Sequence, residues 1–402
     1  MDKLTFIFLS ILLCGSAVAT RPRPRTTGRA TLADDGGVCS AIVGVQNYPC
    51  HEHNVTTGDG YILSLQNIPF GQSGNAATGP RPPVLLHHGV LTDAVTWLLS
   101  PPEQSLALLL ADNGFDVWLV NARGTKYSLG HTSLSSNDPA FWDWSWDELV
   151  AYDLPATFQY IYDQTSQKLH YVGHSMGTLI AFAGFSKGQL VDKLRSAAML
   201  CPIAYIGHMT SPIATNVAQT LLNQTSYWLK IAEFNPTDEA VLQLLLQICK
   251  QKHINCLDLM TSYTGQNCCL NSSIISSFLK NEPQSTSTKN MIHFAQMAQD
   301  GMIKMYDYGD VKENVKHYGT PVPPSYNMTN IPNDVPLFLA YGGKDALSVS
   351  EDVKLLLDSL HEHEQDKLVV QYTENYAHAD FIMGFNATQV VYDPLMAFLR
   401  LH

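Results

Sequence analysis

The fold of this 402-residue chain is decided by one stretch, Leu169-His170-Tyr171-Val172-Gly173-His174-Ser175-Met176-Gly177-Thr178-Leu179-Ile180-Ala181-Phe182. Its first four residues form an apolar run that predicts a buried strand, and residues 178–182 predict a helix. The G-x-S-x-G pattern between them permits a tight strand-to-helix turn that holds a serine hydroxyl exposed. An ordinary Gly-Ser turn is the alternative, but the flanking strand and helix favour a nucleophile, Ser175.

Short apolar runs alternate with helical patterns on both sides of this turn. Strands are predicted at 61–68, 83–87, 117–120, 169–172, 197–202, 335–341 and 368–372, and helices at 104–113, 146–162, 176–187 and 353–360. This alternation predicts an α/β fold, with a mostly parallel sheet covered by helices on both faces. Pro155 should kink or restart the second helix, because proline lacks the N–H that a helix interior requires.

The alternation stops between about residues 206 and 332. Helical patterns at 236–250 and 290–301 lie there, together with four cysteines. Core strands flank the segment, so we interpret it as an inserted helical cap, or lid, over the carboxyl edge of the sheet. The predicted organisation is a signal peptide (1–19), a flexible segment (20–36), a first core part (37–205), the cap (206–332) and a second core part (333–402).

A nucleophilic serine needs a base and an orienting carboxylate, in the chain order Ser, Asp or Glu, His. Asp345 follows the predicted strand 335–341, and His378 follows the strand 368–372, so we predict that they act as charge partner and as general base and acid. The alternatives weighed against them are the histidines His361 and His363, in a charged run, and the carboxylates Asp352 and Asp380.

Acyl transfer also requires donors for the oxyanion. The strand 83–87 ends in His87-His88-Gly89-Val90, and the backbone N–H groups of Val90 and Met176 are predicted to form the oxyanion hole. Because backbone groups donate, side chains at these positions can vary. We interpret His87 as a packing residue.

Composition excludes several classes of protein. With 45% hydrophobic and 15% charged residues the chain is neither disordered nor a coiled coil. A net charge of −12 argues against nucleic-acid binding, because an acidic protein does not neutralise phosphate groups. The possible metal ligands, in His51-Glu52-His53, His361-Glu362-His363 and Cys268-Cys269, lack the spacing of known metal motifs. We therefore expect neither a metal nor an organic cofactor, and no Gly-rich phosphate loop is present.

The start of the chain predicts export. Lys3 precedes the apolar run 4–13, and Ala17-Val18-Ala19 is a small-x-small cleavage site. No later run is long and apolar enough to cross a bilayer. Five sequons are glycosylation candidates: Asn54, Asn223, Asn271, Asn327 and Asn386. We expect a secretory-pathway glycoprotein, extracellular or in a vacuolar or lysosome-like compartment.

Removal of the leader takes Cys14 away and leaves seven cysteines, so at least one thiol stays free. Cys39 with Cys50, and Cys249 with Cys256, are close enough to close small disulfide loops. Disulfide use is also favoured over metal binding for the pair Cys268 and Cys269. Cys201 follows an apolar run and is predicted to be the buried, inert thiol.

The ordered blocks of this sequence resemble the acid lipases of the gastric and lysosomal type, and most closely their plant branch. The resemblance covers nearly the whole mature chain. It is carried by the motif-bearing segments 48–53, 57–63, 88–90, 116–124, 144–148, 152–156, 173–175, 342–345 and 378–381. It implies an α/β-hydrolase core with a mobile cap that hydrolyses esters of triacylglycerols or sterols.

By the family's pattern, Ser175 is the nucleophile, His378 the base and Asp345 its partner, with Val90 and Met176 at the oxyanion hole. Two positions depart from that pattern. Met176 stands where the family usually has Gln. The segment His87-His88-Gly89 stands where the family usually has Gln-His-Gly, so His87 replaces the Gln. The backbone donor at position 176 survives the first change, because it does not depend on the side chain.

The function expected is that of a secreted serine lipase acting on lipid at an oil–water or membrane interface. Ile213, Val217, Leu221 and Leu222 recur at helical spacing, so they could form an apolar face that covers the site and docks on lipid, or could simply pack inside the fold. Two other functions are weighed: a carboxylesterase for short soluble esters, and a non-catalytic binding protein with the hydrolase fold.

Overall fold

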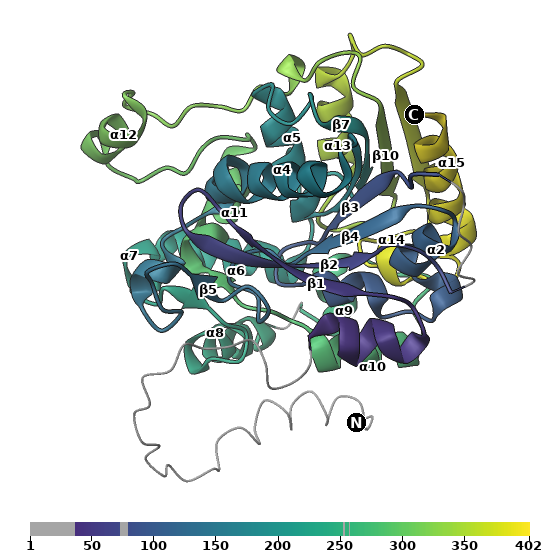
Figure 1. Ribbon diagram of the computed structural model, residues 1–402. Helices are drawn as coiled ribbons and strands as arrows, with labels where there is room; N and C mark the ends of the chain where they lie inside the picture. The colour runs from purple at the N-terminus through teal and green to yellow at the C-terminus, as the bar shows by residue number, and fades with distance from the viewer. Residues whose placement is uncertain (1–36, 73–78, 252–253, 257) are drawn as a thin grey trace.

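The computed structural model describes residues 37–72, 79–251, 254–256 and 258–402, so the predicted signal peptide and flexible segment lie outside the described residues. Its centre is a nine-stranded sheet in the order β1-β2-β4-β3-β6-β7-β10-β11, with β5 paired to β2 (Figure 1). The strands are β1 (His51–Thr56), β2 (Tyr61–Ile68), β3 (Pro83–His87), β4 (Asp116–Val120), β5 (Gly130–His131), β6 (Leu169–His174), β7 (Leu194–Leu200), β10 (Leu337–Gly342) and β11 (Leu368–Thr373).

The six strands from β4 to β11 are parallel, whereas β1, β2 and β5 pair antiparallel. The chain runs from β3 outward to β4 and later returns to place β6 on the other side of β3. The carboxyl ends of β3 and β6 therefore meet at a topological switch point, where α/β sheets bind ligands. His87 on β3 lies opposite Gly173 on β6, two residues before the predicted serine.

Side chains alternate between the two faces of the sheet and fill two hydrophobic clusters. Leu85, Tyr171 and Leu339 enter one cluster, whereas Leu86 and Val172 enter the other. The first cluster is covered by α3 (Trp146–Glu148), α4 (Leu154–Thr165), α5 (Met176–Ser186) and α13 (Ser350–Ser359). The second is covered by α2 (Leu106–Asp112), α14 (Asp380–Met383) and α15 (Asp393–Leu401) (Figure 1).

The predicted α/β class and mostly parallel sheet are confirmed, and each predicted core strand is present with ends shifted by a few residues. Pro155 acts as expected: a π-helical segment covers residues 149–153, and α4 begins at Leu154 with the proline in its first turn. Strand β1 was not predicted. Its residues are mostly exposed at the edge of the sheet, so no apolar alternation marks it.

The segment between β7 and β10 holds the remaining elements. These are α6 (Pro212–Asn223), α7 (Thr225–Trp228), β8 (Glu233–Phe234), α8 (Glu239–Cys249), α9 (Leu259–Thr264), α10 (Ser272–Asn281), β9 (Thr286–Ser287), α11 (Thr288–Asp300) and α12 (Val311–Tyr318). Helices α6, α8 and α11 share a third hydrophobic cluster that includes Ile213, Val217 and Leu221, each at most 7% exposed. This stripe thus packs inside the segment itself and does not present a lipid-docking face.

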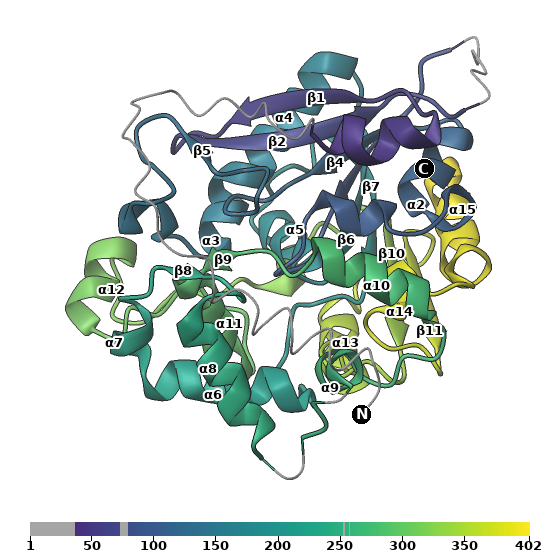
Figure 2. The same ribbon diagram turned by 90° about the horizontal axis from the view of Figure 1, so that it is seen from below.

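Residues 259–281 divide between two clusters, and Leu259 and Tyr263 pack against the third one. Cys269 and Ile274 belong to the second sheet cluster, and Met260, Ile275 and Phe278 pack against it. Figure 2 shows α10 apart from α6, α8 and α11 and nearer to α14. The segment is therefore split between a separate helical layer and the main core.

The disulfides follow the predicted pairs. Cys39 is bonded to Cys50, Cys249 to Cys256, and Cys268 to its neighbour Cys269. Cys201 is the free cysteine of the described chain, and it is buried as predicted. No helix among the described residues has the length and hydropathy needed to span a bilayer.

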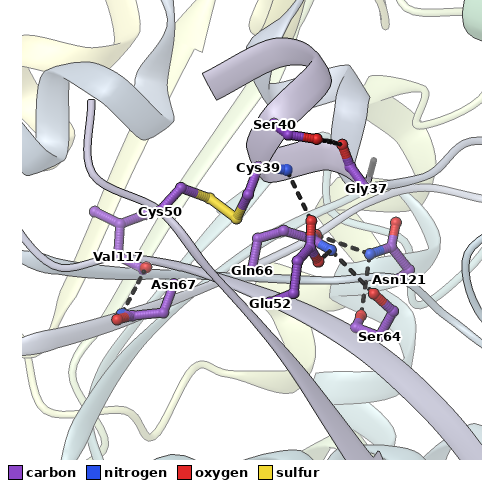
Figure 3. The surroundings of a disulfide bond; sticks show 10 residues. All are labelled: Gly37, Cys39, Ser40, Cys50, Glu52, Ser64, Gln66, Asn67, Val117 and Asn121. Atoms are coloured by element: carbon purple, nitrogen blue, oxygen red, sulfur yellow. Dashed lines mark hydrogen bonds between the residues drawn. A yellow bond between two sulfur atoms is a disulfide. The ribbon is translucent and has the colours of Figure 1, made fainter. Parts of the chain in front are cut away.

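A hydrogen-bonded chain extends inward from the first disulfide (Figure 3). Glu52 accepts from the backbone N–H of Cys39 at 2.7 Å and from the Gln66 amide at 2.6 Å. The Asn121 amide donates to Gln66 Oε1 at 2.9 Å. The N-terminal helix (Cys39–Val43) is thereby connected through β1 and β2 to the carboxyl end of β4.

A buried cation stabilises this end of β4. The Arg123 guanidinium donates to Asp153 and, through Nη1 and Nη2 at 2.6 and 3.0 Å, to Asp59. Its Cζ lies 3.8 Å from the centroid of the Tyr61 ring. The side chains of Arg123 and Asp153 are almost fully buried, so each charge depends on the other for compensation.

We expect Arg123→Leu to lower the free energy of unfolding by about 3–5 kcal/mol, because it leaves a buried carboxylate uncompensated. Urea unfolding would measure the loss. Lys304→Leu, which removes the partly exposed pair with Asp300, is the control and should cost less than about 1 kcal/mol. Equal losses in the two variants would contradict the role given to the buried pair.

Candidate active site

Ser175 occupies the turn between β6 and α5 with φ 55° and ψ −118°, a conformation that costs a non-glycine residue energy. Two glycines make this turn possible. A Cβ added to Gly173 would lie 2.8 Å from the Gly177 carbonyl carbon. A Cβ at Gly177 would overlap the His87 carbonyl oxygen and lie 3.1 Å from that of His88. Because neither glycine has a Cβ, the end of β3, the turn and the start of α5 can pack this closely.

Asp345 and His378 are brought together from the loops after β10 and β11. His378 Nδ1 lies 2.8 Å from Asp345 Oδ2. Oδ1 of Asp345 accepts from the N–H groups of Leu347 and Ser348, both at 2.8 Å. Burial works against the Asp345 carboxylate, but the neighbouring His378 and these hydrogen bonds hold its pKa below the usual value. Asp345 is thus suited to stabilising a positive charge on the imidazole.

His378 also lies beside the nucleophile turn. The His378 carbonyl oxygen accepts a hydrogen bond from Nε2 of His174, the residue before Ser175, at 3.1 Å. The imidazole rings of His174 and His378 have centroids 4.8 Å apart. Among the described residues, Ser175 Oγ makes no hydrogen bond to the His378 ring. Serine–histidine hydrogen bonds are often long in unliganded enzymes and tighten when substrate binds.

The predicted oxyanion donors flank the serine. Within the described chain, neither the N–H of Val90 nor that of Met176 donates to a protein acceptor. Gly89, which precedes Val90, approaches so closely that a Cβ there would lie 3.1 Å from Ser175 Cβ and 3.6 Å from its Oγ. Met176 follows Ser175 directly and Val90 follows Gly89, so both unused N–H groups belong to residues next to the serine contact, an arrangement that can stabilise an oxyanion.

The two histidines before Gly89 are buried and neutral. Burial lowers the pKa of His87 to about 4 and that of His88 to about 3. His88 Nε2 accepts from the N–H of Ala122 at 3.0 Å, which fixes the end of β3 against the end of β4. Both rings therefore act in packing, as predicted for His87.

The alternative residues lie outside this arrangement. The side chain of His361 is 67% exposed, and His363 bonds to the Val335 carbonyl. Asp352 accepts from the backbone and ring of His208, which excludes it as the partner of His378. Asp380 is buried and lies two residues after His378, but its carboxylate accepts from backbone N–H groups and not from the His378 ring.

Sequence reasoning did not assign a site role to His174 or Asn290, nor to the Cys201 sulfur. Burial lowers the pKa of His174 to about 3 and raises that of the Cys201 thiol, so both stay uncharged beneath His378. Asn290 on α11 places its amide 3.8 Å from Met176 Sδ. His174 is marked in the sequence by its place in the motif around Ser175. Asn290 and Cys201 are not marked, because they reach the site from distant segments of the chain.

Ser175 and His378 are nearly buried, with 8% and 5% of their surfaces exposed. Ser285 and Thr286 of the inserted segment cover a small hollow beside Gly89 and Met176, together with Leu91 and Trp144. The hollow has a volume of about 10 Å³, roughly enough for one water molecule. Because the two catalytic candidates are this buried, an ester can reach Ser175 only if neighbouring residues such as this cover move.

A pair of buried carboxyl groups joins the cover to the oxyanion loop. Glu282 Oε1 accepts from the Asp93 N–H and the Thr96 hydroxyl, both at 3.1 Å. Burial raises the pKa of both Glu282 and Asp93, and the Asp93 charge raises that of Glu282 further. At Asp93 the Val95 N–H, the Lys126 cation and a hydrogen bond with Glu282 partly offset the effect of burial. Gln284 adds a bond from its N–H to the Leu91 carbonyl at 2.8 Å. The contact is therefore strongest when the pair holds a proton.

We expect Gly177→Ala to reduce kcat by about 100-fold, because the added methyl pushes the end of β3 away from the nucleophile turn. Steady-state kinetics on a chromogenic ester would measure the change. Gly184→Ala, in the same helix, is the matched control, since its Cβ would meet Leu190 at an ordinary 3.4 Å. A Gly177→Ala enzyme as active as Gly184→Ala would contradict this geometry.

Stability should fall as pH rises because of the Asp93–Glu282 pair. The folded-state pKa of Glu282 lies above the ordinary value of 4.5, so above that pH the unfolded chain releases a proton that the folded protein keeps. Glu282→Gln should flatten the decline between pH 5 and 8 by up to about 1.4 kcal/mol per pH unit. Thermal or urea unfolding across pH would measure it, and parallel curves for the two proteins would refute the assignment.

Comparison with known proteins agrees with the fold. The model described as the α/β hydrolase fold matches residues 82–375, and the partial α/β-hydrolase lipase region matches residues 39–101. The chain belongs to the α/β-hydrolase lipase family.

Particular relatives can be named. The chain is 51% identical over 367 residues to triacylglycerol lipase 2 of Arabidopsis thaliana, covering 91% of this chain and 88% of that one. It is 36% identical to human gastric triacylglycerol lipase, covering 90% of both chains. Among solved structures, a lipase in its open form has a TM-score of 0.55 at 16% identity, covering 88% of this chain and 99% of that one. At that identity the likeness concerns the fold alone.

Proposed function

We propose that this protein is a serine lipase that hydrolyses carboxylic esters of triacylglycerols, or of sterols, through an acyl-enzyme on Ser175. The observation that carries the proposal is the position of Ser175. It sits on a strained turn against Gly89, next in sequence to the unused N–H of Met176, and the hydrogen-bonded pair His378 and Asp345 lies beside the turn. The named lipases to which the chain is similar support the same function.

The proposed reaction has two steps. His378 accepts the Ser175 proton as Oγ attacks the ester carbonyl, and the N–H groups of Val90 and Met176 donate to the oxyanion. Asp345 holds the imidazole orientation and stabilises its positive charge. The alcohol leaves with the proton from His378, and water activated by the same imidazole then releases the fatty acid.

The burial of Ser175 and His378 supports a lid function for the inserted segment, for which we propose the boundaries 206–332. An acyl chain cannot reach a serine that is 8% exposed, so the cover formed by Ser285, Thr286 and Leu91 beside it has to move before catalysis. An oil–water or membrane interface is the partner that we propose for the open form. This proposal places no lipid contact on the buried stripe of α6.

We further propose a secretory-pathway location, extracellular or in a lysosome-like compartment. The three disulfides suit an oxidising compartment. Four sequon asparagines are exposed, namely Asn54, Asn223, Asn271 and Asn327. Asn386 is half-buried and accepts from the Tyr376 hydroxyl at 2.8 Å, so it is the sequon least suited to carry a glycan.

We expect Ser175→Ala to lower fatty-acid release by at least about 1,000-fold, because the nucleophile is lost. The purified protein would be assayed on emulsified long-chain triacylglycerol, on a sterol ester and on short soluble esters. Activity that rises when the substrate forms an emulsion would support the lipase. Activity confined to short soluble esters would favour a carboxylesterase, and turnover unaffected by Ser175→Ala would overturn the mechanism.

A further inference from the structure

Asp380 is a buried carboxyl group that the proposed reaction does not use. It lies two residues after His378 and is 0% exposed. Its oxygens accept from the N–H groups of Ala377 at 2.8 Å, Cys269 at 3.0 Å and Cys268 at 3.2 Å. In the part of the chain that the structure describes, no cationic side chain forms an ion pair with it. Backbone donors alone therefore satisfy this carboxylate.

Two of the three donors belong to a disulfide between neighbouring residues. The bond between Cys268 and Cys269 closes a small ring around a single peptide unit and limits the rotation of its backbone. Phe385 adds a bond from its N–H to the Cys269 carbonyl at 2.8 Å. Because both sulfurs are bonded to each other, the group formed by Cys268, Cys269 and Asp380 is unsuited to holding a metal.

The residues just before this disulfide touch both loops of the catalytic pair. The Thr264 carbonyl accepts from the His378 N–H at 3.2 Å and from the Ala346 N–H at 3.3 Å. Gly265 forms a β-bridge with Asp345, and with φ 101° it packs so closely that a Cβ would overlap the Lys344 carbonyl. A segment of the insertion thus lies against the backbone of both His378 and Asp345.

We propose that Asp380 is a positioning residue for His378, and that the disulfide-closed turn at Cys268 and Cys269 is the fixed support against which it acts. This inference rests on the proposed function, because it assumes that His378 is the base. The Asp380 carboxylate connects the N–H of Ala377, the residue before His378, to the N–H groups of Cys268 and Cys269. The imidazole is therefore positioned by its hydrogen bond to Asp345 and by the fixed backbone that carries it. Residues 264–269 then belong to the catalytic support and not to the moving cover.

The test is Asp380→Asn. The amide keeps the size of the side chain but replaces one acceptor with a donor that faces backbone N–H groups. We expect kcat to fall about 10- to 100-fold through misplacement of the imidazole, with KM within about twofold of the wild type. Asp352→Asn is the matched control, because Asp352 is a similarly buried carboxylate whose side chain accepts from His208 and from neither triad residue.

A second pair of variants tests the support. Cys268→Ser with Cys269→Ser removes the disulfide but keeps both N–H donors, and it should lower kcat about 3- to 10-fold with little change in KM. Cys39→Ser with Cys50→Ser removes the distant disulfide and should leave kcat unchanged. If Asp380→Asn does not accumulate as folded protein, this comparison decides the question.

A phosphonate ester with a nitrophenolate leaving group separates positioning from folding. Ser175 Oγ bonds to phosphorus, nitrophenolate departs, and His378 takes the hydroxyl proton. Asp380→Asn should label to full stoichiometry but more slowly than Asp352→Asn, whereas a merely structural role would lower the labelled fraction and leave the rate unchanged. Labelling and kcat equal to those of Asp352→Asn would overturn the inference while the proposed function stands. Turnover by Ser175→Ala would overturn both.

Discussion

The close approach of β3 to the start of α5 is the constraint on which the site depends. Gly177 meets the carbonyl groups at the end of β3 with no room for a side chain, and Gly89 meets Ser175. Both contacts exist because β3 and β6 are neighbours at the point where the strand order reverses. One backbone contact therefore sets the serine conformation, the direction of α5 and the place of the Val90 N–H. The buried rings of His87 and His88 pack beside this contact.

Buried carboxylates at this edge of the sheet are stabilised in four different ways. Asp153 has a guanidinium, Asp345 has an imidazole with two N–H groups, Asp380 has three N–H groups, and Asp93 shares its environment with Glu282. Burial raises the pKa of Asp153 and of Asp380 despite their partners, whereas His378 and the two N–H groups hold the pKa of Asp345 below its usual value. At Glu282, burial and the neighbouring Asp93 charge raise the pKa to about 9, so this pair holds a proton and makes the closed form sensitive to rising pH.

The inserted segment serves two physical roles. Helices α6, α8 and α11 share the third hydrophobic cluster, and Met297 of α11 also enters the first sheet cluster. Leu259 and Tyr263 pack against the third cluster, whereas Cys269 and Ile274 belong to the second sheet cluster, and Thr264 and Gly265 bond to the loops of Asp345 and His378. The insertion is thus anchored to the core most firmly at residues 264–274, beside the catalytic loops.

The sequence by itself determined the local features of this protein: the core strands, the restart of the helix at Pro155, the turn at Ser175, and the cysteine pairs that are close along the chain. Each depends on residues within about a dozen positions, where periodicity, glycine and proline act directly. It also indicated Asp345 and His378, because each follows a predicted strand. Only the tertiary structure decided that these two side chains form a hydrogen bond, that β1 is an edge strand, that the stripe of α6 is buried, and that Asp380 bonds to Cys268 and Cys269. Those outcomes depend on which segments become neighbours in space, and hydrogen bonds between distant backbone groups leave no pattern in the amino-acid sequence.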